Sequence, residues 1–143
     1  RTLIRPGLIF GTTIAGTRST LVLWVKKSLA AKQNINVTTD HFRTASYVKD
    51  LAAMTLQVAQ SPNKGIYHTC GADYLSVYEM ALKVAEAFHL DQNLIIPVRS
   101  SSFTAQAPRP ACTNFSAKKA IRDFGFKSRS FEEALNEMKL NKQ

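Results

Sequence analysis

The feature that most constrains the fold of this chain is the apolar run from Thr2 to Phe10, which is rich in leucine and isoleucine. The run shows little alternation between apolar and polar residues, which is typical of a strand buried on both faces in a parallel sheet. Gly7 and Gly11 punctuate it. The sequence therefore predicts an α/β fold in which a few mostly parallel strands pack against several helices.

Helical spacing of apolar residues, capping boxes and terminating glycine or proline residues indicate where the helices lie. The expected helices cover residues 19–33 and 47–60, a third starts at Ser76, a fourth runs from Ser116 to a stop at Gly125, and a fifth starts at Ser130. Short strands are expected over residues 34–40, 65–71 and 94–98, the last at a sheet edge because Pro97 has no N–H to donate. Residues 100–110 form a polar loop of a length that often carries function, and residues 141–143 are expected to fray.

Composition excludes several classes of function. The 143 residues are enough for one domain with a sizeable core. The longest apolar candidate for a membrane span, Leu21 to Val25, is interrupted by Lys26 and is far shorter than the ~20 residues that a span requires. The net charge of +9 is scattered over separate segments, so a solvated basic surface is preferred to a nucleic-acid partner. Cytoplasm is the expected location, with no membrane contact.

Neither a metal centre nor a disulfide framework is expected. Cys70 and Cys112 are interpreted as free thiols, because two cysteines form no framework and show no metal-ligand spacing. The three histidines are also scattered. No catalytic constellation is apparent either, since the chain contains no Gly-x-Gly-x-x-Gly loop, no Walker loop and no paired loop carboxylates.

Two arginines in loops remain as candidate ligand-binding residues. Arg43 lies just before a predicted helix, and Arg109 lies between Pro108 and Pro110, whose fixed φ angles stiffen the backbone. A planar guanidinium suits two phosphate oxygens, and a helix N-terminus adds a favourable dipole. Two such arginines are able to hold a diphosphate. Packing against loops or binding of carbonyl groups is an equally good interpretation from spacing alone.

Five segments in register resemble the C-terminal half of the extended short-chain dehydrogenase/reductases. They are Arg5-Pro-Gly-Leu-Ile-Phe-Gly11, Arg43-Thr-Ala-Ser-Tyr-Val-Lys-Asp-Leu-Ala52, Gly65-Ile-Tyr-His-Thr-Cys-Gly71, Ser76-Val-Tyr-Glu79 and Ala107-Pro-Arg-Pro110. Within this superfamily the pattern is most similar to the dTDP-4-dehydrorhamnose reductases and their epimerase and dehydratase relatives. The resemblance covers nearly the whole chain and implies a Rossmann-like parent protein that uses NAD or NADP and binds a nucleotide sugar.

The resemblance also implies roles for particular residues. Pro6 and Gly7 would lie near the nicotinamide, and Phe10 and Gly11 would begin the substrate-facing loop. Arg43 and Arg109 would contact the nucleotide diphosphate. Asp50, on the helix that follows Arg43, would have a structural role.

Two departures from the family pattern limit what this chain does by itself. The glycine-rich cofactor loop and the catalytic Tyr-x-x-x-Lys are both absent, since Tyr47 and Tyr78 are followed at the fourth position by leucines. Hydride transfer by the chain alone is therefore not expected, and the cofactor-binding part is expected to lie upstream of Arg1. The family's reductases also tend to have Gly-x-Pro-Thr where this chain has His41-Phe-Arg-Thr44, which moves it toward the epimerase pattern.

The sequence leaves alternatives open for the parent protein. One is a nucleotide-sugar epimerase or dehydratase, and another is a non-catalytic relative such as the regulatory subunit of methionine adenosyltransferase. A third is a basic binding module that shares only the fold. The expectation preferred here is the substrate-binding half of a nucleotide-sugar oxidoreductase, residues 1–143, and a homodimer is open as its assembly.

Overall fold

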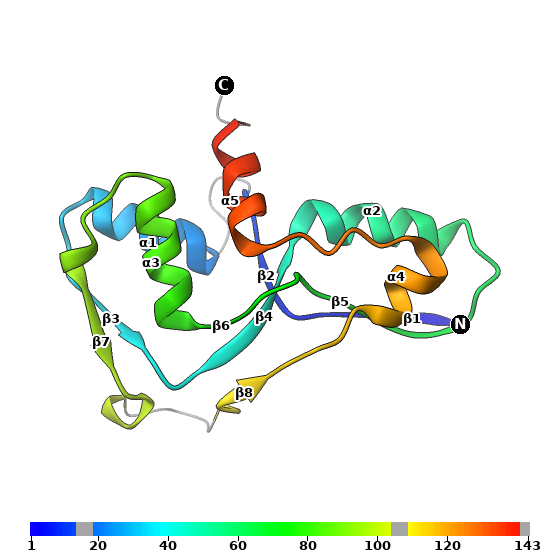
Figure 1. Cartoon of the computed structure of the whole chain (residues 1–143), viewed down its shortest axis with the longest axis horizontal. Coiled ribbons are helices and arrows are strands. Elements are labelled where there is room, and N and C mark those ends of the chain that lie inside the picture. The colour runs from blue at the N-terminus through cyan, green and yellow to red at the C-terminus, as the bar shows by residue number, and fades with distance from the viewer. Residues whose placement is uncertain (14–18, 104–108, 141–143) are drawn as a thin grey trace.

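The computed structural model describes residues 1–13, 19–103 and 109–140 (Figure 1). The helices are α1 (Leu21–Ala30), α2 (Val48–Ala59), α3 (Val77–Ala87), α4 (Lys118–Phe124) and α5 (Phe131–Leu140). The strands are β1 (Thr2–Pro6), β2 (Leu8–Phe10), β3 (Ile35–Thr38), β4 (Phe42–Tyr47), β5 (Gly65–Thr69), β6 (Tyr74–Ser76), β7 (Ile95–Val98) and β8 (Cys112–Thr113). Two 3₁₀ turns, η1 (Gln92–Leu94) and η2 (Ser100–Ser102), flank β7.

The N-terminal apolar run forms two strands instead of the single strand expected from sequence. β1 pairs in parallel with β5, and β2 pairs in parallel with β4. The change of partner occurs at Gly7, whose N–H donates to the Ser46 hydroxyl at 2.8 Å and to the Thr69 carbonyl at 3.3 Å. A Cβ at Gly7 would clash with the Thr44 carbonyl oxygen. Only glycine therefore lets the chain pass this close to β4.

β4 is the strand on which the other segments converge (Figure 1). Its second half pairs with β2 and its first half pairs with β6, antiparallel, and with β8, parallel. A separate parallel pair joins β3 to β7, with Val37 opposite Pro97. Among the described residues every strand pairing except β4 with β6 is parallel, as the sequence predicts.

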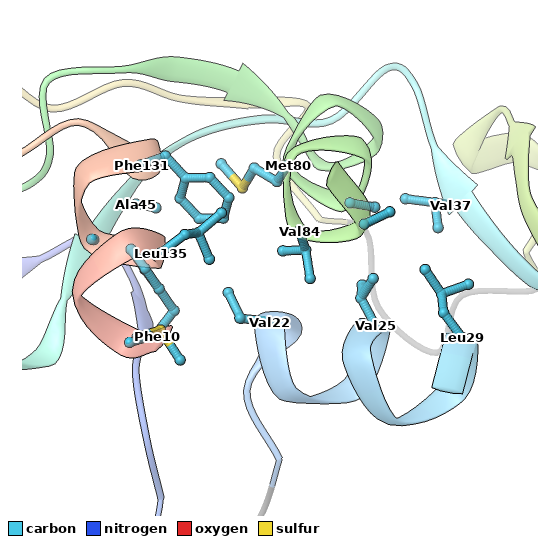
Figure 2. Packing of buried hydrophobic residues seen from close by; sticks show 14 of the residues in the cluster. Phe10, Val22, Val25, Leu29, Val37, Ala45, Met80, Val84, Phe131 and Leu135 are labelled. Atoms are coloured by element: carbon cyan, nitrogen blue, oxygen red, sulfur yellow. The ribbon is translucent and has the colours of Figure 1, made fainter. Parts of the chain in front are cut away.

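The larger hydrophobic core lies between α1, α3 and α5 (Figure 2). Val22 and Val25 on one face of α1 point toward α3, where Val84 lies, and Leu29 points toward Val37 of β3. On the other side, side chains of α5 reach the end of β2 and the middle of β4, where Phe131 packs on Phe10 with ring centroids 4.8 Å apart. The helical spacing of apolar residues that the sequence shows thus becomes the buried faces of these three helices.

A smaller core lies under β1 and β5. Tyr67 is 2% exposed and packs edge-on against Phe124 on α4, and Met54 on α2 is fully buried beside it. Among the described residues the opposite face of these two strands is only partly covered: the Phe115 ring stacks on His68, but the paired residues Leu3 and Ile66 are 38% and 41% exposed. The expectation of a strand buried on both faces is therefore wrong for the described structure, where α2 and α4 pack on one face of this pair and the other stays partly exposed.

The predicted helix ends are mostly confirmed. The Ser76 hydroxyl accepts from the Glu79 N–H at 3.1 Å while the Glu79 carboxylate accepts from the Ser76 N–H, which is a complete capping box. Ser130 and Glu133 form the same arrangement at α5. Gly125 ends α4 in the left-handed conformation, with φ of 61°. The first helix ends at Ala30, earlier than expected, because the chain turns at Lys32, which has a φ of 57°.

None of the helices in the described parts of the chain is both long and apolar enough to cross a membrane. The frayed end expected at residues 141–143 lies outside the described residues.

Candidate functional site

The candidate site is built on the first half of β4, where β6 and β8 flank the strand on its two edges. Arg43 pairs with Leu75 on β6 and with Thr113 on β8. Phe42 donates its N–H to the Ala111 carbonyl at 2.7 Å, and the Phe115 N–H donates to the Thr44 hydroxyl at 3.2 Å. The segment that follows Arg109 is thereby aligned along β4.

Arg43 binds backbone carbonyls of its surroundings. Its Nη1 donates to the carbonyl oxygens of Phe42 at 2.7 Å and Ala111 at 2.9 Å, and its Nη2 donates to the Pro110 carbonyl at 2.7 Å. A guanidinium carries five N–H donors, so these three bonds leave the Nε–H and one Nη2–H for another ligand. The residue is half-buried. Arg43 is therefore observed to bind carbonyl groups, which is one of the two interpretations that the sequence left open. Its two remaining N–H groups leave the other, phosphate binding, possible as well.

Arg109 is exposed and stands one residue before the carbonyl that Arg43 binds. Pro108, which was expected to stiffen its backbone from the other side, lies outside the described residues. The two arginines that the sequence singled out are thus brought to the same end of β4, although they are far apart in the chain. Their shared position is able to present positive charge to one anionic ligand.

Asp40 binds Ser100, which lies at the start of the loop over residues 100–110. Its two carboxylate oxygens accept from the Ser100 N–H at 2.9 and 3.2 Å, and one of them accepts from the Ser100 hydroxyl at 2.8 Å. These hydrogen bonds hold the pKa of the Asp40 carboxyl below its usual value, with burial opposing them in part. Asp40 and Arg43 therefore attach the two ends of the loop to the same edge of the fold.

Tyr74 and Cys112 stand beside Arg43 on the flanking strands. The Tyr74 ring lies 5.6 Å from the Phe42 ring, and a hydrogen bond with the Cys112 thiol, together with burial, raises the pKa of Tyr74. The Arg43 charge acts in the opposite direction. The sequence indicated neither Tyr74 nor Cys112 as a site residue, because β6 and β8 are too short to show a strand pattern.

Phe10 and Gly11 lie at the opposite end of β4 from Arg43. Phe10 pairs with Tyr47, four residues beyond Arg43, which is roughly 13 Å along an extended strand. The Phe10 side chain is 2% exposed and belongs to the core, and a Cβ at Gly11 would clash with Val48. The structure therefore does not bring these residues together with the arginines, and their substrate contact stays a prediction.

Pro6 and Gly7, expected near a nicotinamide, lie between the two ends. Pro6 lines an open groove of about 460 Å³ between β1 and α2, whose walls are mainly apolar. A second hollow, bordered by Tyr47, Gly71 and Arg129, holds only about 10 Å³, which is room for at most one water. Of these two hollows, the groove at Pro6 is therefore the one large enough to bind an apolar ring or an apolar surface of a partner.

A partly buried ionic cluster, which the sequence did not reveal, joins α2 to α5. Arg129 Nε lies 3.0 Å from Asp50 Oδ1, and Arg129 Nη1 forms a close ion pair with Glu137. Glu137 also bonds Lys49 at 2.9 Å. Burial raises the pKa of Asp50, and the charge of Arg129 offsets this only in part. The structural role expected for Asp50 thus has a concrete basis.

Within the described residues no group of three or more His, Cys, Asp or Glu side chains is placed to hold a metal ion. Cys70 is buried, Cys112 is exposed, and both are free thiols.

Comparison with known proteins gives one matching family model, described as the RmlD substrate binding domain, over residues 1–142. The chain is 30% identical over 136 residues to the spore coat polysaccharide biosynthesis protein SpsK of Bacillus subtilis (strain 168), covering 95% of this chain and 46% of that protein. It is 31% identical over 114 residues to methionine adenosyltransferase 2 subunit beta of Xenopus tropicalis, covering 75% of this chain and 33% of that protein. The chain thus spans less than half the length of these relatives.

Among solved structures, the chain is similar to dTDP-4-dehydrorhamnose reductase from Bacillus anthracis str. Ames in complex with NADP. The TM-score is 0.85 at 24% sequence identity, and the match covers 97% of this chain and 48% of that one. At this identity the likeness shows the fold alone. It confirms the α/β, Rossmann-like architecture that the sequence predicts.

Proposed function

This chain belongs to the RmlD substrate binding domain family, and on that premise we propose that it is the substrate-binding part of an NAD(P)-dependent oxidoreductase acting on a nucleotide sugar. The family assignment confirms the resemblance found in the sequence. The proposal concerns what the whole protein does, because the chain spans only about half of the reductase that it resembles in structure.

The observation that carries the proposal is that Arg43 binds the Pro110 carbonyl, so that Arg109, one residue earlier, lies at the same end of β4. Arg109 is exposed, and Arg43 keeps two N–H groups beyond its three carbonyl contacts. Guanidinium groups bind phosphate oxygens through charge-assisted hydrogen bonds, which are stronger than neutral ones. The two side chains are therefore suited to the diphosphate of a nucleotide sugar, remote from the carbon that reacts.

The partly exposed face of β1 and β5 supports an upstream cofactor-binding part. A pair of parallel strands is not independently stable, and parallel sheets are covered on both faces. Leu3 and Ile66 are exposed on one face, and the groove that contains Pro6 opens beside α2. A preceding Rossmann-like half that adds strands next to β1 and a covering helix would bury this surface.

The residues present fit a nicotinamide at that junction. Pro6 offers an apolar wall in an open groove beside α2, and Gly7 follows it directly in the chain. The cofactor, bound mainly by the upstream half, would supply the hydride. The Tyr-x-x-x-Lys that handles the proton in this superfamily is absent from this chain and would also come from upstream, so residues 1–143 orient the substrate and do not catalyse alone. A cytoplasmic location goes with this activity.

Orientation is a chemical contribution in its own right. Binding energy from the diphosphate, far from the reacting carbon, holds the sugar in a productive position and reduces the entropy lost in the reaction step. Arg43 and Arg109 would supply that energy, and the short strands β6 and β8 would fix where the diphosphate lies. The sugar itself would then extend toward the upstream half.

Thermal unfolding of the complete protein tests this proposal. Addition of dTDP-rhamnose or UDP-glucose together with NADPH is expected to raise the melting temperature, because ligands that bind the native state stabilise it. S-adenosylmethionine serves as a control ligand without a sugar diphosphate. A melting temperature that responds to none of the nucleotide sugars would contradict the proposed function.

A second candidate is a non-catalytic regulatory relative, favoured by the 31% identity to methionine adenosyltransferase 2 subunit beta. The residues encoded upstream distinguish the two. An intact Tyr-x-x-x-Lys supports the oxidoreductase or an epimerase or dehydratase with the same acid-base pair, whereas its loss, together with co-purification of a methionine adenosyltransferase catalytic subunit, supports the regulator.

A further inference from the structure

Three hydrogen bonds make Arg43 the main side-chain attachment of the segment that follows Arg109. They reach the carbonyl oxygens of Phe42, Pro110 and Ala111, at 2.7, 2.7 and 2.9 Å respectively. Two of these carbonyls belong to the residues immediately after Arg109. The guanidinium thus connects β4 directly to the backbone that carries the second arginine.

Backbone pairing alone gives this segment little support. β8 contains only Cys112 and Thr113, and the ladder with β4 is supplemented by the bonds from Phe42 N–H to Ala111 and from Phe115 N–H to Thr44. Pro110 has no N–H with which to join a ladder. The Arg43 guanidinium, which donates to the successive carbonyls of Pro110 and Ala111, therefore supplies hydrogen bonds to a stretch of backbone that forms few bonds with a strand.

We propose that Arg43 is a positioning residue for Arg109: it fixes the backbone of Pro110 and Ala111 against β4 and thereby fixes where the Arg109 side chain meets the diphosphate. This inference rests on the proposed function for the identity of the ligand. It differs from a role in which both arginines are independent phosphate ligands, because here the contribution of Arg109 depends on Arg43.

The chemistry of the side chain makes the two roles separable. Lysine keeps the positive charge but is a point donor on a flexible stem, and it does not reproduce a planar fork that spans two successive carbonyls. If Arg43 acts only through its charge, Arg43→Lys retains most of the affinity. If Arg43 acts by positioning, Arg43→Lys loses nearly as much affinity as Arg43→Ala.

The test is a double-mutant cycle in the complete protein, with calorimetric titration of dTDP-rhamnose into the Arg43→Lys, Arg109→Ala and doubly substituted variants. Arg109→Ala in the otherwise unchanged protein is expected to weaken binding about tenfold, the magnitude of one charge-assisted hydrogen bond. In the Arg43→Lys background the same change is expected to weaken it by less than about twofold. Lys27→Ala, an exposed charge on α1, serves as the matched loss-of-charge control and is expected to change nothing.

Hydrogen exchange supplies a readout that is independent of ligand. In Arg43→Lys the amides of Phe42 and Phe115 are expected to exchange at least about tenfold faster, as local opening becomes easier, while amides of α1 and α3 exchange at their original rates. Arg109→Ala should leave all of these rates unchanged, since Arg109 is not the attachment.

These measurements test the positioning role of Arg43 separately from nucleotide-sugar binding. Full additivity of the two substitutions, or unchanged exchange at Phe42 and Phe115 in Arg43→Lys, would overturn the positioning role while leaving nucleotide-sugar binding intact. If the unsubstituted protein binds neither dTDP-rhamnose nor UDP-glucose, the proposed function fails, and the exchange measurement still decides whether Arg43 holds the segment.

Discussion

Gly7 is a residue at which the fold leaves no room for a side chain. It passes so close to β4 that a Cβ would meet the Thr44 carbonyl, a backbone atom that cannot rotate away. Gly125, by contrast, has a positive φ of 61° but open space around its Cβ position. The two glycines are needed for different reasons, close approach in the first and backbone conformation in the second.

Gly7→Ala is therefore expected to lower the free energy of unfolding by about 3 kcal/mol, because either β1 or β4 must shift. Gly125→Ala is the matched control, expected to cost about 1 kcal/mol for the left-handed conformation alone. Denaturant titration of both variants measures the difference. Equal losses would show that β4 is not tightly approached at Gly7.

The hydrogen bonds between Asp40 and Ser100 make the stability of the protein depend on pH. The folded-state pKa of Asp40 is lowered from the ordinary value of 3.8, chiefly by the Ser100 hydroxyl hydrogen bond. Its contribution to stability is therefore complete above pH 3.8 and is lost as pH falls through the lower folded-state pKa. Asp40→Ala is expected to reduce the melting temperature at pH 7, and the difference from the unsubstituted protein should shrink below pH 3.8.

Ser101→Ala, an exposed serine in the same 3₁₀ turn, is the control and should show no such dependence. A difference between Asp40→Ala and the unsubstituted protein that widens on acidification would contradict the assigned sign.

At the scale of elements, the cluster of Asp50, Arg129 and Glu137 joins α2 to α5. Asp50 is 7% exposed and has a raised pKa because burial outweighs the attraction of Arg129. Removal of Arg129 leaves a buried carboxylate without its counter-ion, which is more costly than losing a surface pair. Arg129 also stacks over the Tyr47 ring at 5.6 Å.

Arg129→Met is expected to lower the free energy of unfolding by about 2 kcal/mol at pH 8. The loss should be smaller at pH 5, because removing the Arg129 charge raises the folded-state pKa of Asp50 further, so the variant gains more stability than the unsubstituted protein as pH falls. Adding Asp50→Asn should recover part of the loss at pH 8. A destabilisation that is independent of pH and of Asp50→Asn would show that the pair contributes nothing.

How far sequence predicted these elements depends on the range of the interactions. Capping boxes at Ser76 and Ser130 and the glycine stop at Gly125 act within one helical turn, so they were found correctly. β4 was missed, because its mixed polar sequence was interpreted as a loop carrying Arg43, and β6 and β8 were missed, because strands of two or three residues acquire their identity from pairing with β4. The contacts of Arg43 with Pro110 and of Arg129 with Asp50 join residues 67 and 79 positions apart, and no local pattern encodes them.

At the scale of the whole molecule, the exposed residues Leu3 and Ile66 on one face of β1 and β5 support the proposal that an upstream half packs there. If an upstream half covers that face, residues 1–143 expressed alone should bind the dye ANS and self-associate, since exposed apolar patches of this kind are interaction surfaces. The complete protein should do neither. Leu3→Lys combined with Ile66→Lys should reduce dye binding by the isolated chain, whereas the exposed pair Ala52→Lys and Gln57→Lys on α2 should not.

An isolated chain that stays monomeric and binds no dye would contradict the coverage by an upstream half. The distinction matters for function as well, because only the complete protein is expected to hold a cofactor next to Pro6 and Gly7.

The central claim is that this fold binds a nucleotide sugar through the arginines at the end of β4, and calorimetric titration of dTDP-rhamnose into the complete protein and its Arg109→Ala variant tests it most directly. The account predicts saturable binding by the unsubstituted protein, weakened about tenfold by Arg109→Ala, with the melting temperature of the ligand-free protein unchanged because Arg109 is exposed. Equal affinity in the two proteins, or no binding of dTDP-rhamnose or UDP-glucose by either, would contradict it.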